Sequence, residues 1–201
     1  YIDIDVDVKQ LAEDMTRVGN EYDSASNLIN ATKLVIGQIT ECEPHPDSDH
    51  LHLCKVNIGT EVLDIVCGAP NARTGLKVIV ALDGAVLPEK TIKKGMIRGQ
   101  ESNGMLCSIA ELGLEHKFLK PEDSEGIAEL GEDAEIGGDP IKYLQMDDGV
   151  IDFELTANRG DLLSILGMAY ELGAIYDKKV KPVEYGYKET GEDLSLIHIS
   201  E

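Results

Sequence analysis

The sequence predicts an α+β fold in which a small five-stranded β-barrel is inserted into a discontinuous α+β domain. Three observations support this: a capped helix at the start, short apolar runs separated by turns in the middle, and a strand with a second helix after residue 149. Neither the first helix nor the tail is large enough to bury its own apolar stripe, so we expect them to pack together. The predicted domains are residues 1–33 with 149–201, and residues 34–148.

The first element is expected to be a helix with signals at both ends. Asp7 is placed to be the N-cap, and Gln10 three residues later completes a capping box. Apolar residues recur at helical spacing as far as Val18, and Gly19 supplies the stop. The polar residues 22–30 are expected to form a connection.

The central block is expected to be all β, with turns at residues 57–60 and 83–84. A short helical piece is expected at 109–114. Five strands at this spacing suit a small closed barrel such as an OB-fold, and a sandwich is also compatible. The five predicted strands are residues 34–42, 51–58, 61–67, 77–82 and 91–98.

The tail begins with residues 150–155, where apolar and acidic residues alternate as in a half-buried strand. A second helix with a broad apolar face is expected after Asn158. Gly167 and Gly173 lie within it, and we expect them to mark close packing against another backbone. Two further strands are predicted at residues 180–187 and 194–200.

Composition narrows the class of protein. The net charge is −20 over 201 residues, which argues against general affinity for nucleic acid and requires any RNA contact to be a local patch. No apolar run is long enough to span a membrane. The first residue is Tyr1 rather than Met, so we expect residues upstream. Four scattered cysteines suggest reduced thiols in a cytosolic protein.

Catalytic and metal sites are not predicted. Zinc-ligand residue types cluster at the start of the barrel, but without the paired spacing of a structural zinc site. No phosphate-binding glycine motif or nucleophile elbow occurs. A zinc or thiol enzyme is kept as an alternative hypothesis. Bound metal or a reactive cysteine would test it. The clustered residues are Cys42, His45, His50, His52 and Cys54.

One basic stretch stands out in this acidic chain. Lys90, Lys93, Lys94 and Arg98 are followed by a loop of small residues, 99–105. On a single strand, Lys94 and Arg98 would share a face and follow one run of phosphates, while Lys93 would point away. A solvated basic edge that discourages strand pairing explains the pattern equally well.

The central block also resembles the tRNA-binding OB domain found in several synthetases and in free-standing tRNA-binding proteins. The resemblance rests on ordered motifs over roughly 100 residues. One departure is His50, where that family usually has Lys. The motifs are His45-Pro46-Asp47-Ser48-Asp49-His50-Leu51, Ile65-Val66-Cys67-Gly68-Ala69-Pro70-Asn71, Ile97-Arg98-Gly99, Ser102-x-Gly104-Met105-Leu106-Cys107-Ser108 and Glu111-Leu112-Gly113-Leu114.

A second resemblance covers the flanks. Residues 153–169 and the opening residues 1–21 are similar to bacterial phenylalanine–tRNA ligase β chains. Here Ala157 replaces the usual Pro, Leu162 the usual Cys, and Tyr170 stands where Arg is common.

The two resemblances imply a non-catalytic N-terminal part of that β subunit. They imply a cytoplasmic α₂β₂ enzyme with an α-subunit partner, tRNA as substrate, and ATP and Mg²⁺ as cofactors of the full complex, with none of these cofactors bound by this chain. The editing and anticodon-reading modules would lie beyond residue 201. The expected tRNA-facing residues are Lys93, Lys94, Arg98, Asn71, Ser102 and Met105.

Besides a zinc or thiol enzyme, the sequence leaves two alternatives open. One is a free-standing tRNA-binding protein or RNA chaperone, although such a protein would not need the segment from Asn158 to Ala169. The other keeps the ligase assignment but makes the OB domain a spacer or assembly surface that scarcely binds tRNA.

Overall fold

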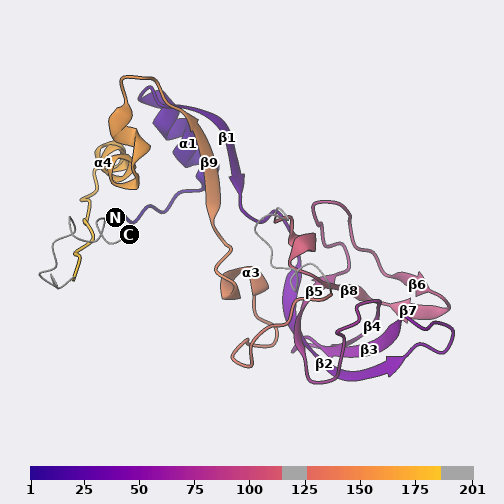
Figure 1. The fold of residues 1–201 in the computed structure, drawn as a ribbon. Coiled ribbons are helices and arrows are strands. Elements are labelled where there is room, and N and C mark those ends of the chain that lie inside the picture. The colour runs from indigo at the N-terminus through magenta and orange to yellow at the C-terminus, as the bar shows by residue number, and fades with distance from the viewer. Residues whose placement is uncertain (115–125, 187–201) are drawn as a thin grey trace, which may run out of the picture. The chain divides into compact units, whose positions relative to one another are not determined.

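The computed structural model describes residues 1–114 and 126–186 (Figure 1). Contacts divide the chain into two compact units. The first contains Tyr1–Ala25 and the chain from Ile151 onward, and the second contains Ser26–Val150.

The second unit is built on a curled five-stranded antiparallel sheet with the order β4-β3-β2-β5-β8. The curl brings the edge strand β4 to the segment before β8, where the Asn103 N–H donates to the Asp64 carbonyl oxygen over 2.8 Å. The sheet is therefore a half-barrel. Its strands are β2 (Leu34–Pro44), β3 (His52–Asn57), β4 (Val62–Cys67), β5 (Lys77–Leu82) and β8 (Gly104–Cys107).

Strand β5 is buried on both faces, which explains its continuous apolar run. Val78 and Val80 face the interior of the half-barrel, while Ile79 and Ala81 contribute to a second apolar cluster. The interior is filled closely. A Cβ at Gly37 of β2 would lie 2.7 Å from methyl carbons of both Val56 and Val80, so glycine is needed there.

The fifth predicted strand, residues 91–98, forms only in part and does not belong to the main sheet. Within it, Thr91 forms an isolated bridge with Val86, and β6 (Gly95–Ile97) pairs with β7 (Gln100–Ser102) in a separate hairpin (Figure 1). Arg98 (φ 46°) and Gly99 (φ 82°) reverse the chain in the backbone geometry of a type I′ turn. The strand that completes the sheet is instead β8, whose first two residues were expected to belong to the loop at 99–105.

The first unit begins with α1 (Val8–Arg17), whose predicted N-cap is confirmed. The Asp7 carboxylate accepts hydrogen bonds from the N–H groups of Lys9 and Gln10, and Gly19 has a φ of +97°. The other half of the predicted capping box, a hydrogen bond from the Gln10 side chain back to residue 7, was wrong. The Gln10 side chain donates to the Asp14 carboxylate instead.

The expected connection at residues 22–30 was also wrong for most of its length. β1 (Glu21–Asn27) is a strand that pairs with β9 (Gly149–Glu154), a partner more than 100 residues away in sequence. The predicted strand at 150–155 is confirmed by β9. Ile151 and Phe153 are half-buried, while Asp152 and Glu154 are exposed.

The second helix has two pieces, η3 (Gly160–Leu163) and α4 (Ile165–Tyr176). Close packing at its glycines is confirmed. A Cβ at Gly167 would collide with the Asp161 carbonyl oxygen, and one at Gly173 would lie 2.9 Å from that of Lys178. The apolar face is only partly buried within the described residues, since Leu163 is 81% exposed.

Among its described residues, the second unit also contains two short helices, η1 (Ala110–Leu112) and α3 (Pro140–Tyr143). The first of them lies within the helical piece expected at 109–114. The strand predicted at 180–187 is not formed over residues 180–186, and residue 187 and the strand predicted at 194–200 lie outside the described residues. No helix in the described parts has both the length and the apolar character needed to cross a membrane.

Candidate nucleic-acid interface

The basic stretch forms an exposed arm that leads into the β6–β7 hairpin. Lys93 and Lys94 directly precede β6, and Arg98 occupies its turn. None of these three forms an ion pair with a described residue. Lys90 differs, because its ammonium lies 2.8 Å from the Glu111 carboxylate. We call Lys93, Lys94 and Arg98 the basic arm.

Hydrogen bonds hold this arm at both ends. The Lys94 N–H donates to the Asp83 carboxylate over 2.9 Å. At the turn, Nη1 of Arg98 donates to the Asp47 carbonyl oxygen over 3.3 Å, which ties the hairpin to the loop between β2 and β3. The expected sharing of a strand face by Lys94 and Arg98 does not apply, because residues 93–98 do not form one strand.

The Asn71 side chain forms hydrogen bonds within the domain. Its Nδ2 donates to the Ile127 carbonyl oxygen (2.9 Å), and its Oδ1 accepts from the Ile127 N–H (3.0 Å). Nδ2 also contacts Glu129 over 3.1 Å, and Glu129 is paired with Arg73 at 2.7 Å. The amide therefore pairs with the 127–129 segment as a neighbouring strand would, and its tRNA-binding role stays a prediction.

Ser102 and Met105 lie where the hairpin returns to the sheet. The Ser102 hydroxyl is buried, donates to the Gly104 carbonyl oxygen and accepts from the Val66 N–H, both over 3.1 Å. It thereby links β7 to β4. Met105 is half-buried and lines a cavity of about 340 Å³ together with Lys93 and Ser102. The structure brings these three predicted residues together, whereas Asn71, Lys94 and Arg98 do not line this cavity.

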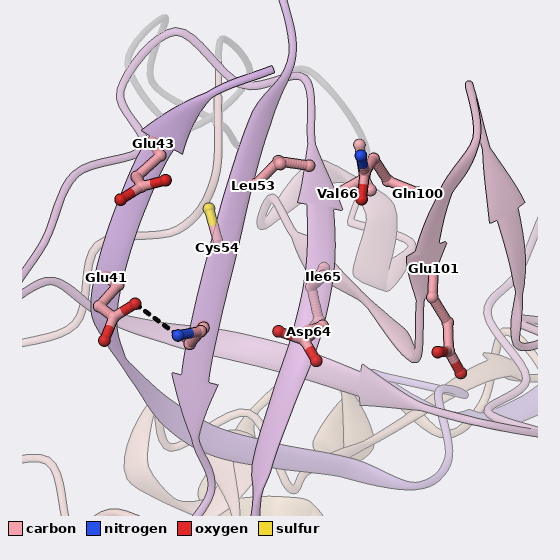
Figure 2. Close-up of a pocket in the computed structure, with 10 residues that line it drawn as sticks. Glu41, Glu43, Leu53, Cys54, Asp64, Ile65, Val66, Gln100 and Glu101 are labelled. Carbon is pink, nitrogen blue, oxygen red and sulfur yellow. Dashed lines mark ion pairs between the residues drawn. The ribbon is translucent and has the colours of Figure 1, made fainter. Parts of the chain in front are cut away.

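A larger cavity, of about 440 Å³, lies over β2, β3, β4 and β7 and is acidic (Figure 2). Glu41 and Lys55 form an ion pair at 2.7 Å, and this lysine is the only basic residue in the lining. Oligonucleotides bind to this region of the sheet in many OB-folds, but the uncompensated carboxylates here repel phosphate. The acidic lining residues are Glu41, Glu43, Asp64 and Glu101.

Sequence reasoning did not identify this acidic cavity, although a signal was present. Glu41 and Glu43 are two residues apart on one strand and therefore face the same side. Their approach to Asp64 and Glu101, in contrast, follows from the curl of the sheet and the position of the hairpin.

The Cys/His cluster at the start of the barrel splits into separate contacts. Cys42 and Cys54 face each other across β2 and β3 with their sulfur atoms 3.8 Å apart. His45 is 3% exposed, and its Nδ1 accepts from the Asp47 N–H. Within residues 1–114 and 126–186, no group of three or more metal-ligating side chains is positioned to hold an ion.

The buried thiols have a low tendency to ionise. Burial raises the pKa of Cys107 to about 12, and it also raises the pKa values of Cys54 and Cys67. Because the thiolate is the nucleophile, these cysteines are poorly suited to nucleophilic catalysis near neutral pH.

Ser108 has a structural role that its sequence context could have revealed. Its hydroxyl accepts from the Glu111 N–H, and the Glu111 carboxylate accepts from the Ser108 N–H over 3.0 Å. This reciprocal pattern is a capping box at η1, and S-x-x-E is its sequence signature.

A curled five-stranded antiparallel sheet with an exposed basic arm is the arrangement described so far, and comparison with known families gives its class. Residues 34–139 match the family described as "Putative tRNA binding domain". The chain belongs to this family.

The whole chain is also similar to the N-terminal part of bacterial phenylalanine–tRNA ligase β subunits. It is 46% identical to the subunit of Streptococcus pneumoniae (strain ATCC BAA-255 / R6), over 95% of this chain and 24% of that protein. It is 47% identical to that of Lactiplantibacillus plantarum, over 89% of this chain and 23% of that protein. The chain thus spans about a quarter of the length of these curated relatives.

Among solved structures, the chain is similar to a MetRS related protein from Pyrococcus horikoshii. The identity is 20%, the TM-score is 0.38, and the match covers 52% of this chain and 85% of that one. A score of this size does not establish a common fold.

Proposed function

We propose that this chain is a non-catalytic, tRNA-binding part of a phenylalanine–tRNA ligase β subunit, and that the basic arm contacts the tRNA backbone. The observation that carries the proposal is the arm itself. Three exposed cations without ion pairs to described residues project from a domain of a tRNA-binding family, in a chain whose net charge is −20. Such a patch gives the local phosphate affinity that the overall charge opposes.

In the architecture proposed here, an OB-fold is inserted into a discontinuous α+β domain. The half-barrel and the pairing of β1 with the distant β9 support this arrangement. In the full cytoplasmic enzyme, an α subunit, ATP and Mg²⁺ would take part in attaching phenylalanine to tRNA. Among the described residues no group of three or more metal-ligating side chains is positioned to hold an ion, and the sequence has no glycine motif for phosphates. We therefore assign no chemical step to this chain.

The test is a titration of the 201-residue chain with labelled tRNA at low and at physiological salt. The triple variant Lys93→Ala, Lys94→Ala and Arg98→Ala is compared with wild type. We expect wild type to bind with an affinity that falls with salt, and the variant to lose binding. The slope of log affinity against log salt should correspond to about two or three phosphate contacts.

A matched control separates the arm from net charge. Lys9, Lys142 and Lys179 are also exposed and form no ion pairs with described residues. Replacing all three with Ala makes the same change in charge and should leave binding within about two-fold. Equal losses in both triple variants would contradict the assignment of the arm. Absence of wild-type binding even at low salt would leave the domain a spacer or assembly surface.

A further inference from the structure

The cavity at the base of the hairpin differs in character from the acidic one. It has a volume of about 340 Å³, at the lower end of the range for ligand pockets, and lies between β4, β6 and β8. Its walls are mostly apolar and include Val66, Ile97 and Met105. Three polar residues also line it, Lys93, Thr91 and Ser102. We call it the hairpin pocket.

From this lining we infer that the hairpin pocket receives the base of one unpaired RNA nucleotide, whose phosphate lies against Lys93. This inference rests on the proposed function and specifies its substrate as RNA with an accessible unpaired nucleotide. Ile97 is 41% exposed and contributes apolar surface to the lining. The thioether of Met105 provides a polarisable partner for an aromatic ring, which is useful in a pocket that contains no aromatic side chain.

The charge around the hairpin pocket favours a nucleotide as its occupant. The pocket opens beside the basic arm, so a base that enters it has its phosphate in an attractive field. The acidic cavity gives the opposite field. A base inside a duplex stays stacked and paired, and only an unpaired or extruded base reaches a pocket of this kind.

The polar groups imply weak discrimination among bases. The Ser102 hydroxyl is engaged with Val66 and Gly104, so it holds the pocket wall in place and is already occupied. The Thr91 hydroxyl has no hydrogen-bond partner among the described residues and can pair with a base edge or ribose. Recognition therefore depends mainly on apolar contact, which tolerates different bases.

The chain contains two matched pairs that separate pocket binding from general attraction. Lys93 lines the pocket, whereas its neighbour Lys94 does not. Ile97 lines it, whereas Met96 on the same strand does not, although Met96 is 68% exposed. Truncation of Ile97 or Met96 to Ala removes exposed apolar surface without changing charge.

The experiment measures binding of the 201-residue chain to labelled single-stranded RNA and to a blunt RNA duplex with the same number of phosphates. Salt is fixed, and thermal unfolding checks that each variant is folded. We expect wild type to prefer single-stranded RNA by at least about ten-fold. Since charge density alone favours the duplex, such a preference requires contact with bases. Ile97→Ala should lower single-strand affinity by about five- to ten-fold, and Met96→Ala by less than about two-fold.

The lysine pair gives a second readout. Lys93→Ala should weaken single-strand binding several-fold more than Lys94→Ala, although both remove one charge. Equal binding of duplex and single strand, or equal effects within both pairs, would overturn the inference while leaving tRNA binding intact. Failure of wild type to bind any RNA would overturn the proposed function as well.

Discussion

Asn71 and Ile127 exchange two hydrogen bonds, with the Asn71 amide donating to the Ile127 carbonyl oxygen (2.9 Å) and accepting from its N–H (3.0 Å). The side chain thus takes the place of a backbone partner for a segment 56 residues away. It belongs to a motif that resembles a tRNA-binding signature, and the structure gives this asparagine a role in holding the fold together.

Replacing Asn71 with Ala should therefore destabilise the domain. Two hydrogen bonds to the backbone of residue 127 are lost, and we expect the free energy of unfolding to fall by about 1–2 kcal/mol. Asn103 is a control, because its side chain makes no hydrogen bond to a described residue, and Asn103→Ala should change stability by less than about 0.5 kcal/mol. Urea unfolding measures both. An unchanged midpoint for Asn71→Ala would show that the pair contributes nothing.

Arg98 combines an unfavourable backbone position with a charge suited to RNA. Its φ of 46° places a non-glycine residue in the left-handed region at a turn where Asn-Gly is preferred. Arg98→Asn should leave stability unchanged or raise it by up to about 1 kcal/mol, while affinity for tRNA falls several-fold and the salt slope drops by about one. Thermal unfolding and a salt titration test this. A variant that is clearly less stable would mean that the contact with Asp47 outweighs the backbone cost.

Gly104 starts β8 where there is no space for a side chain. A Cβ there would lie 2.7 Å from the Ala81 carbonyl oxygen on the neighbouring strand β5. Gly104→Ala should cost about 1–3 kcal/mol of stability. Gly95, in β6, faces open space, and a Cβ added to it would meet no atom of a neighbouring segment within 4 Å, so Gly95→Ala should stay within about 0.5 kcal/mol. Similar denaturation midpoints for the two variants would contradict the close approach at Gly104.

Stability of the first unit should depend on pH through Glu171. Hydrogen bonds from Arg159 and Asn20 lower the pKa of this carboxyl below its ordinary value of 4.5. A carboxyl with a lowered pKa stabilises the fold above its ordinary pKa, and this contribution is lost as the pH falls through the folded-state value. The advantage of wild type over Arg159→Gln should thus be full at neutral pH and shrink as the pH falls below 4.5.

Denaturant unfolding at a series of pH values gives this comparison. Lys179→Gln, at an exposed position without an ion pair to a described residue, is the control and should show a difference from wild type that is nearly independent of pH. A wild-type advantage over Arg159→Gln that persists unchanged well below pH 4.5 would rule out the linkage.

Much of the fold was predictable because its signals are local. Asp7 marks the start of α1, and the apolar run from Lys77 to Leu82 identifies β5 at its observed limits. The basic arm was also evident, since its three cations lie close together in an otherwise acidic chain. The acidic cavity and the hairpin pocket were not, because each is lined by several elements that the sequence does not place side by side.

By itself, the sequence determined the helix caps, the apolar strand β5 and the motifs that place the chain in its family, since each depends on residues close together in the chain. Tertiary structure decided that β1 is a strand, because its polar residues show no period-two pattern and the pairing partner is β9. It also decided that residues 104–107 complete the sheet, since β5 offers a free edge there and the Arg98–Gly99 turn reverses the chain toward it. Strand pairing over long sequence separations depends on which backbone edge is available in the folded chain, and local sequence does not encode that information.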